Sequence, residues 1–264
     1  MAGPSRTSDI PDFVRNNVFV VCPVYAGEEH GTGTAFLLHE DYTYLGHRIL
    51  LTNRHCIIPS TFPGPDGKPK SEAHELADKY KALGIVPNDT PPEKVYIYRS
   101  CDDVSPHRVP FEAKWATFDD ARIKMFKTAS GDREGHLDLA VLYFDTPPAG
   151  LDLKGLEGFK FGRDMPQGTK AITCGFGTDT AGNAFKSKCF TVNEIQTCLR
   201  GQGLPGNATD LAGSAGTAYD YFTEPGLAKG HSGGPVFDDA AYQEGDFSPD
   251  LTMRRFEPYP PTSA

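Results

Sequence analysis

The sequence lacks three features that would place it in large functional classes. No stretch approaches the roughly 18–20 consecutive apolar residues of a membrane-spanning helix. No Lys/Arg cluster offsets the net charge of −9, so no basic surface for nucleic acid or anionic lipid is evident. There is no CxxC pair, which argues against structural zinc. We therefore expect no nucleic acid, no membrane, no metal and no cofactor.

The chain also has no apolar signal core among its first ten residues, which are polar. On this basis we expect a cytoplasmic location. The six cysteines are irregularly spaced. An even number keeps disulfides open, and buried free thiols fit the spacing equally well.

Glycine and proline are abundant, with 28 and 22 residues in a chain of 264. They favour many short elements joined by tight turns. Short β-branched and aromatic runs recur along the chain. These predicted strands are residues 18–22, 34–38, 48–52, 94–98, 137–144, 170–174, 188–192 and 218–222. Strands at such intervals predict an all-β fold, an antiparallel barrel or sandwich.

One segment, residues 71–84, has helical periodicity. A serine can cap its start, acidic residues occupy its first turn and Gly84 can end it. We interpret residues 59–93 around it as an insertion on a β scaffold. The Pro-containing segment 145–168 is the predicted linker between an N-terminal and a C-terminal half.

The strongest local signal is Gly-His-Ser-Gly-Gly-Pro at residues 230–235. Acyl transfer needs two preorganised donors for a tetrahedral oxyanion, and the backbone N–H groups of a tight turn can supply them. Here these would be the N–H groups of Gly230 and Ser232, with glycines that allow a substrate to approach closely. The competing interpretation is any Gly-rich turn that contains a serine.

A serine hydroxyl needs a base to accept its proton. Among eight histidines, His55 stands just beyond an apolar strand, although a lone histidine is more often a satisfied core or surface residue. The imidazole in turn needs an orienting carboxylate. Asp138 lies within an apolar strand, where a carboxylate is costly unless it is hydrogen-bonded. Asp132 and Asp145 are alternatives that flank turn-like segments.

Three segments, in this order, resemble the signatures of the chymotrypsin/trypsin-like serine peptidases: residues 52–56, 137–142 and 230–235. The order His, Asp, Ser separates this arrangement from the subtilisin and α/β-hydrolase orders. The Gly-rich strand at 31–37 and the Gly-Phe-Gly turn at 175–177 are also similar to that family.

The resemblance implies two antiparallel six-stranded β-barrels with the triad between them. Residues 17–150 would form the first barrel, which carries the histidine and the aspartate. Residues 151–240 would form the second, which carries the serine, and residues 241–264 an acidic and Pro-rich tail. The implied activity is that of a serine endopeptidase that hydrolyses polypeptide substrates through an acyl-enzyme. In it Ser232 attacks, and His55, oriented by Asp138, acts first as base and then as acid.

The chain departs from this family at several positions. His231 replaces the aspartate that pairs with a newly cut N-terminus in zymogen-type members, so we expect no activation by trimming. Cys56 lacks its usual partner in the Gly-rich strand. Cys22 is an alternative partner, but we expect free thiols. The specificity pocket would take its floor from Gly226, with Lys229 nearby to contact an acidic substrate. With no acid at position 226, a preference for Lys or Arg is not supported.

After Phe237 the family continues with two more strands, whereas this chain continues with an acidic, turn-prone stretch. The chain is truncated there, or its last strands are irregular, or something else completes the second barrel. Two alternatives to an active enzyme follow. One is a peptidase-derived binding module without catalysis, and the other is a protein whose second barrel a partner segment completes by strand addition.

Overall fold

A computed structural model of the chain describes the parts on which the following account rests. They are residues 10–30, 33–59, 80–86, 90–99, 110–118, 126–128, 131–133, 139–162, 171–176, 190–195, 197–200, 220–223 and 232–249. Among these residues, no helix combines the length and apolar character that a bilayer crossing requires.

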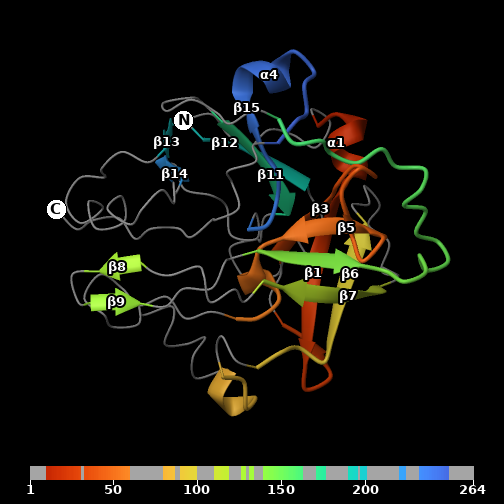
Figure 1. Cartoon of the computed structure of the whole chain (residues 1–264), viewed down its shortest axis with the longest axis vertical. Coiled ribbons are helices and arrows are strands. Elements are labelled where there is room, and N and C mark those ends of the chain that lie inside the picture. Colours follow the sequence, from red (N-terminus) through yellow and green to blue (C-terminus); the bar gives the residue numbers. More distant parts are fainter. Residues whose placement is uncertain are drawn as a thin grey trace.

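Six antiparallel strands close into a barrel in the first half of the chain (Figure 1). They are β1 (Val18–Tyr25), β3 (Gly33–Leu37), β5 (His47–Thr52), β6 (Lys94–Arg99), β7 (Phe111–Thr117) and β10 (Ala140–Tyr143). Their order around the ring is β1-β3-β5-β10-β7-β6, and β6 pairs back with β1. Two short strands extend the sheet, β2 (Glu28–Glu29) beside β1 and β4 (Thr43–Tyr44) beside β5. The all-β prediction is thereby confirmed, and the first barrel is closed.

The alternation of side chains along the strands explains why this barrel closes around one core. In β7, Phe111 and Ala113 are buried while Glu112 and Lys114 are exposed. In β1 every residue is buried, because both faces of this strand are covered. Phe19 and Val21 point into the barrel interior with residues of the other strands. Each fully buried side chain of this size contributes roughly 1.5–3 kcal/mol to folding.

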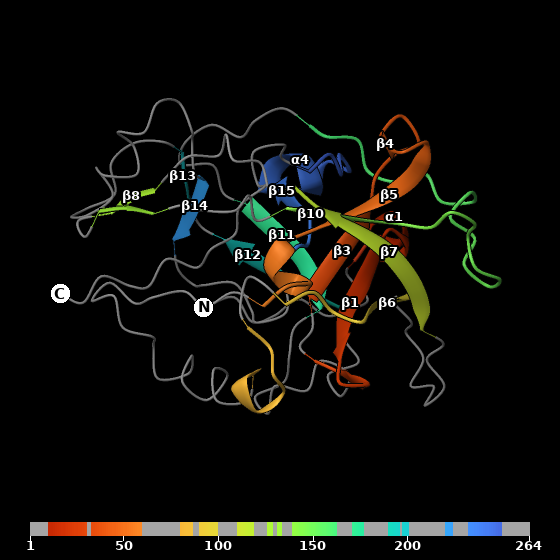
Figure 2. The same ribbon diagram turned by 60° about the horizontal axis from the view of Figure 1, so that its bottom comes forward.

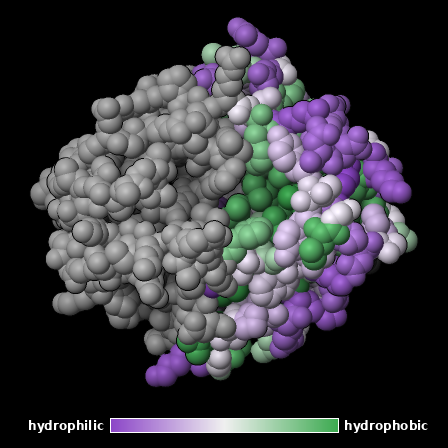
Figure 3. All heavy atoms as spheres, viewed as in Figure 1, coloured by the Kyte–Doolittle hydropathy of each residue, from purple (hydrophilic) through white to green (hydrophobic). Residues whose placement is uncertain are grey.

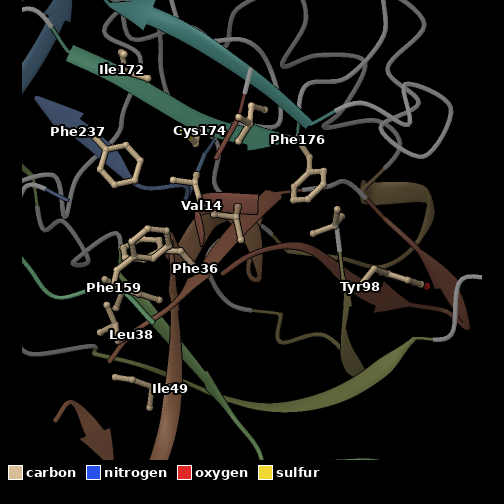
Figure 4. Close-up of a cluster of buried hydrophobic side chains, with 14 of the residues drawn as sticks. Val14, Phe36, Leu38, Ile49, Tyr98, Phe159, Ile172, Cys174, Phe176 and Phe237 are labelled. Atoms are coloured by element: carbon tan, nitrogen blue, oxygen red, sulfur yellow. The ribbon is translucent and has the colours of Figure 1, made fainter. Parts of the chain in front are cut away.

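The opposite face of β1 belongs to a second core, which joins the barrel to the C-terminal half. Val18, Val20 and Cys22 pack there with side chains from β11 (Ala171–Phe176) and β15 (Val236–Asp238). Figure 4 shows side chains of the barrel strands and of these two later strands pointing toward one another. The two halves therefore share a continuous apolar layer.

The C-terminal half is also built from antiparallel strands. β11 lies between β12 (Phe190–Ile195) and β15 in a three-stranded sheet, which Figure 2 shows beside β1 and β3. A separate pair consists of β13 (Thr197–Arg200) and β14 (Asp220–Thr223). Strands β11 to β15 lie among the residues predicted to form the second barrel. In the N-terminal half, β8 (Phe126–Thr128) and β9 (Gly131–Arg133) form a further pair apart from the first barrel.

After β15 the described chain forms a helix and a loop. Helix α4 (Asp239–Gln243) is capped by the Asp238 carboxylate, which accepts from the Ala241 N–H at 3.0 Å. The loop then returns to the core, where Phe247 stacks on Phe13, and the latter belongs to α1 (Asp12–Asn16). Residues 239–249 contain no strand, and the three alternatives for this region all stay predictions. Residues 250–264 lie outside the described part.

The segment that follows the first barrel lies against it. Leu151 and Leu153 are buried in the barrel core, and Phe159 forms a parallel bridge with Leu38. The Arg48 guanidinium donates to four carbonyl oxygens, of which three belong to this segment. The division between the predicted domains at residue 150 stays a prediction.

The predicted helix at residues 71–84 is described at its C-terminal end, where residues 80–82 are helical. Gly84 has φ +69°, its N–H donates to the Lys81 carbonyl, and the Ile85 N–H donates to the Tyr80 carbonyl at 2.8 Å. These two bonds form a Schellman motif, in which a glycine adopts the left-handed conformation that ends a helix. The predicted end of the helix at Gly84 is therefore confirmed.

Candidate active site

His55 lies in a 3-10 turn that begins directly after strand β5. The turn, η2 (Arg54–Cys56), is held by hydrogen bonds from the Cys56 N–H to the Asn53 carbonyl and from the Ile57 N–H to the Arg54 carbonyl. Arg54 and Cys56 are buried, while His55 between them is partly exposed. The turn therefore fixes the backbone on both sides of His55, which is itself partly exposed.

A buried tyrosine is hydrogen-bonded to the residue that follows this turn. The Tyr25 hydroxyl lies 2.8 Å from the Ile57 carbonyl oxygen and 3.2 Å from that of Thr90. Burial, and to a lesser degree the neighbouring Tyr80, raises the pKa of Tyr25, while Arg54 lowers it. The net effect keeps the hydroxyl protonated, so it remains a donor to the turn that carries His55.

Ser232 begins a tight turn that approaches the first barrel closely. The next residue, Gly233, has φ +84°, and a Cβ atom there would stand 2.9 Å from the Asn53 nitrogen. That atom would lie closer still to the Thr34 carbonyl oxygen and the Thr52 hydroxyl. Glycine is required at this position both for its backbone conformation and for this close approach.

The main chain of Ser232 is hydrogen-bonded to the first barrel. Its carbonyl oxygen accepts from the Thr34 N–H at 2.8 Å and from the Cys56 thiol at 3.3 Å. Because Cys56 follows His55 directly, the turn that carries Ser232 and the turn that carries His55 are in direct contact. Ser232 itself is partly exposed. The structure thus brings two of the predicted site residues onto adjoining turns that are far apart in the sequence.

Thr34 connects three parts of the molecule at this point, and the sequence did not single it out. Its carbonyl accepts from the Thr52 hydroxyl at 2.6 Å, and its own hydroxyl accepts from the Phe176 N–H at 3.0 Å. Thr34 and Thr52 are both buried. The Gly-Thr-Gly-Thr string at residues 31–34 was the available signal, but the contacts depend on residues 18 to 198 positions away.

The remaining predicted site residues lie outside the described part of the chain. They are Asp138, Gly230, Gly226 and Lys229. Their positions, and the triad as a whole, stay predictions. Asp145, one of the alternatives to Asp138, is described and exposed, and it forms an ion pair with Lys114 and a longer one of 3.8 Å with His47.

The cysteines with described side chains are free thiols: Cys22, Cys56 and Cys174. The prediction of free thiols is confirmed for these three. The residue that faces Cys56 from the Gly-rich strand is Gly33, and a Cβ atom there would lie 2.7 Å from the Cys56 Cβ. This distance is shorter than the roughly 3.5–4.5 Å between the Cβ atoms of a disulfide, so Gly33 leaves room for the Cys56 side chain as a free thiol.

In the view of Figure 3 the described residues present hydrophilic side chains along the outer edge and apolar ones toward the middle of the molecule.

No family model matches the chain, and no curated protein matches its sequence. Several solved structures are similar over most of its length. The Rv3671c protease from M. tuberculosis, in its active form, is 16% identical with a TM-score of 0.43, covering 90% of this chain and 73% of that one. The serine endoprotease from Yersinia pestis is 13% identical with a TM-score of 0.42, covering 90% of this chain and 55% of that one. The protease Anisep from Arthrobacter nicotinovorans is 12% identical with a TM-score of 0.48, covering 86% of this chain and 79% of that one.

Proposed function

We propose that the protein is a serine endopeptidase that cleaves polypeptides through a Ser-His-Asp triad. One observation carries the proposal: the Ser232 carbonyl is hydrogen-bonded to Thr34 and to Cys56, the residue directly after His55. The motif of His55 and the motif of Ser232 therefore meet, although Cys56 and Ser232 are 176 residues apart. In the proposed site the first motif supplies the base and the second the nucleophile. The contact through Cys56 thus joins the turn of the proposed nucleophile to the turn of the proposed base.

In the proposed reaction the Ser232 hydroxyl attacks the scissile carbonyl carbon while the His55 imidazole takes its proton. The N–H groups of Gly230 and Ser232 stabilise the oxyanion that forms. The imidazolium then gives its proton to the leaving amine, and an acyl-enzyme remains. A water molecule, deprotonated by His55, hydrolyses the ester and returns the enzyme to its starting state.

The register of the first barrel supports Asp138 as the third member. Ala140 pairs with Thr52, so β10 begins at the end of β5 from which the chain continues to His55. We therefore propose that Asp138, two residues before Ala140 in the sequence, lies near the histidine turn. Leu139, the first described residue of this segment, is partly buried. A carboxylate at position 138 would accept a hydrogen bond from the imidazole and fix its tautomer.

A fluorophosphonate probe tests the proposal. The wild-type protein should be labelled at Ser232, and Ser232→Ala should abolish the labelling. His55→Ala should slow both labelling and hydrolysis of fluorescein-labelled casein by roughly 10⁶-fold, and Asp138→Asn by roughly 10⁴-fold. Ser248→Ala, which changes a serine on the loop after α4, is the matched control and should react as the wild type does. Folded wild-type protein that takes up no label would refute the proposal.

A second function is favoured by the chain after Phe237. Residues 239–249 form α4 and a loop, whereas the strands that wall the substrate pocket would be expected there. A peptidase-derived binding module, catalytically impaired, would retain the barrels and bind a polypeptide without cleaving it. In that case Ser232→Ala would leave the biological activity of the protein unchanged, while the endopeptidase proposal predicts its loss.

Specificity and partners belong to the same proposal. Gly226 would leave the floor of the pocket without a carboxylate, and Lys229 would favour an acidic residue in the substrate. A partner segment that adds a strand to the second barrel would supply a pocket wall that residues 239–249 do not form. Comparison of activity in the isolated monomer and in a complex tests this last point, because a fully active monomer needs no such partner.

A further inference from the structure

Cys56 directs its thiol at the main chain of Ser232. We propose that Cys56 is a positioning residue, which holds the nucleophile in place through a hydrogen bond from a free thiol. The catalytic meaning of this inference rests on the proposed function. The hydrogen bond itself does not, so the two proposals can fail separately.

The Ser232 carbonyl has two donors, and both belong to the first barrel. The Thr34 N–H is at 2.8 Å and the Cys56 Sγ atom at 3.3 Å, which is within the normal range for a sulfur donor. A carbonyl oxygen has two lone pairs, so these donors fill its capacity. Fixing this carbonyl restrains the peptide plane after Ser232, and with it the position of the Ser232 Cα–Cβ bond relative to the turn of His55.

The space around the thiol is shaped to keep it in this position. Cys56 is 7% exposed, and Gly33 faces it without a side chain. A Cβ atom at position 33 would overlap the sulfur, so the absence of one creates the room that the thiol occupies. The thiol is not in a disulfide and therefore keeps the hydrogen that it donates.

A buried cysteine can also act simply as a small apolar residue. The two roles differ in what a substitution does. Alanine removes both the donor and the volume, whereas serine keeps a donor on the same carbon atom but fills the space less well and is more polar. If the hydrogen bond positions Ser232, the Cys56→Ser variant should keep the labelling rate that the Cys56→Ala variant loses. If only the volume of the side chain counts, the serine variant should be as slow as the alanine variant.

The rate of fluorophosphonate labelling measures the effect on the nucleophile. Cys56→Ala should lower the maximal labelling rate roughly threefold to tenfold, as expected for the loss of one hydrogen bond, with the half-saturating probe concentration unchanged. Cys56→Ser should recover to within about twofold of the wild type. Equal rates in the alanine, serine and wild-type proteins would overturn the inference, and so would a serine variant as slow as the alanine variant.

Cys22 provides the matched control. It is a free thiol in β1 of the same barrel and is completely buried. Cys22→Ala and Cys22→Ser make the same side-chain changes at a buried thiol that is not a donor to the Ser232 carbonyl. Both should label at the wild-type rate at temperatures where they are folded. A loss equal to that of Cys56→Ala would assign the effect to general destabilisation and contradict the positioning role.

Hydrogen exchange separates the inference from the proposed function. Amide exchange in a peptide that covers residues 232–235 should be roughly threefold to tenfold faster in Cys56→Ala than in Cys56→Ser or the wild type. This readout requires no catalysis. If folded wild-type protein is not labelled, the endopeptidase proposal fails, and the exchange rates still decide whether the thiol orders the turn. Exchange that is unchanged in Cys56→Ala would overturn the inference even in an active enzyme.

Discussion

At the scale of single residues, Gly233 and Gly245 can be compared directly. They have the same backbone conformation, but only Gly233 is closely surrounded by other atoms. Their φ angles are +84° and +87°. A Cβ atom on Gly233 would overlap backbone atoms of β3 and of Asn53, while one on Gly245 would meet nothing within 4 Å. The cost of an alanine at Gly245 is therefore backbone strain alone, of about 1 kcal/mol.

Gly233→Ala should therefore lower the free energy of unfolding by more than the backbone strain alone would. The turn of Ser232 has to move away from Thr34, which stretches both hydrogen bonds to the Ser232 carbonyl. We expect the free energy of unfolding to fall by roughly 2–4 kcal/mol and fluorophosphonate labelling to slow by more than about tenfold. Urea unfolding and labelling rates measure the two effects. Gly245→Ala should lose about 1 kcal/mol and keep its labelling rate, and equal losses in the two variants would contradict the close-approach argument.

At the scale of elements, Arg48 holds residues 151–158, which follow the first barrel, by hydrogen bonds to their carbonyl oxygens. Its Nη1 atom donates to the carbonyls of Leu153 and Leu156, the latter at 2.8 Å, and its Nη2 atom to those of Leu38 and Glu157 at 3.1 and 2.9 Å. Burial lowers the pKa of this guanidinium, which remains charged at neutral pH because its ordinary pKa is so high. The planar fork reaches carbonyls on both sides, which a lysine ammonium cannot do.

Arg48→Lys should therefore release residues 151–158 locally without unfolding the barrel. We expect cleavage by an added protease within this segment to become roughly tenfold faster, together with a loss of about 1–3 kcal/mol in the free energy of unfolding. Lys154→Met, an exposed change in the same segment, is the control and should leave both quantities as they are. Cleavage that first appears elsewhere in the chain would show that Arg48 does not fasten this segment.

The elements also show what the sequence could and could not predict. The β-branched runs of β1, β5 and β6 were found, with ends displaced by a few residues. β7 was missed, although its alternation of buried Phe111 and Ala113 with exposed Glu112 and Lys114 was readable, because alanine and charged residues dilute the signal. The links through Thr34 could not be predicted, since they join residues that only the folded barrel brings together.

At the scale of the whole molecule, two apolar layers account for the arrangement of the halves. One fills the first barrel, and the other joins that barrel to β11, β15 and α4. Phe237 is fully buried in the second layer, in ring contact with Phe159 and Tyr242. The strand that leads away from the Ser232 turn is therefore held by the same layer that covers the outer face of β1. This shared layer, which sequence periodicity alone does not reveal, supports the contact between the two turns.

Three buried tyrosines and a partly buried one make the stability of the whole molecule sensitive to alkaline pH. Burial raises the pKa of each hydroxyl above its ordinary value of 10.0, and for Tyr98 the Glu29 carboxylate adds to the effect; the four are Tyr25, Tyr80, Tyr98 and Tyr242. The folded protein thus keeps protons that the unfolded chain releases above pH 10. Their contribution is complete below pH 10 and is lost as pH rises through the raised values, so stability falls with increasing pH.

Tyr25→Phe removes one of these hydroxyl groups and so tests its contribution to the pH dependence of stability. At pH 7 the variant should be less stable by about 1–3 kcal/mol, because the Ile57 carbonyl loses a donor. Above pH 10 its stability should fall less steeply than that of the wild type, by about 1.4 kcal/mol per pH unit for the one proton removed. Urea unfolding at a series of pH values measures both effects. A double variant with Tyr98→Phe should flatten the slope by twice as much, whereas a slope unchanged in Tyr25→Phe would mean that this hydroxyl ionises in the folded protein as it does in the unfolded chain.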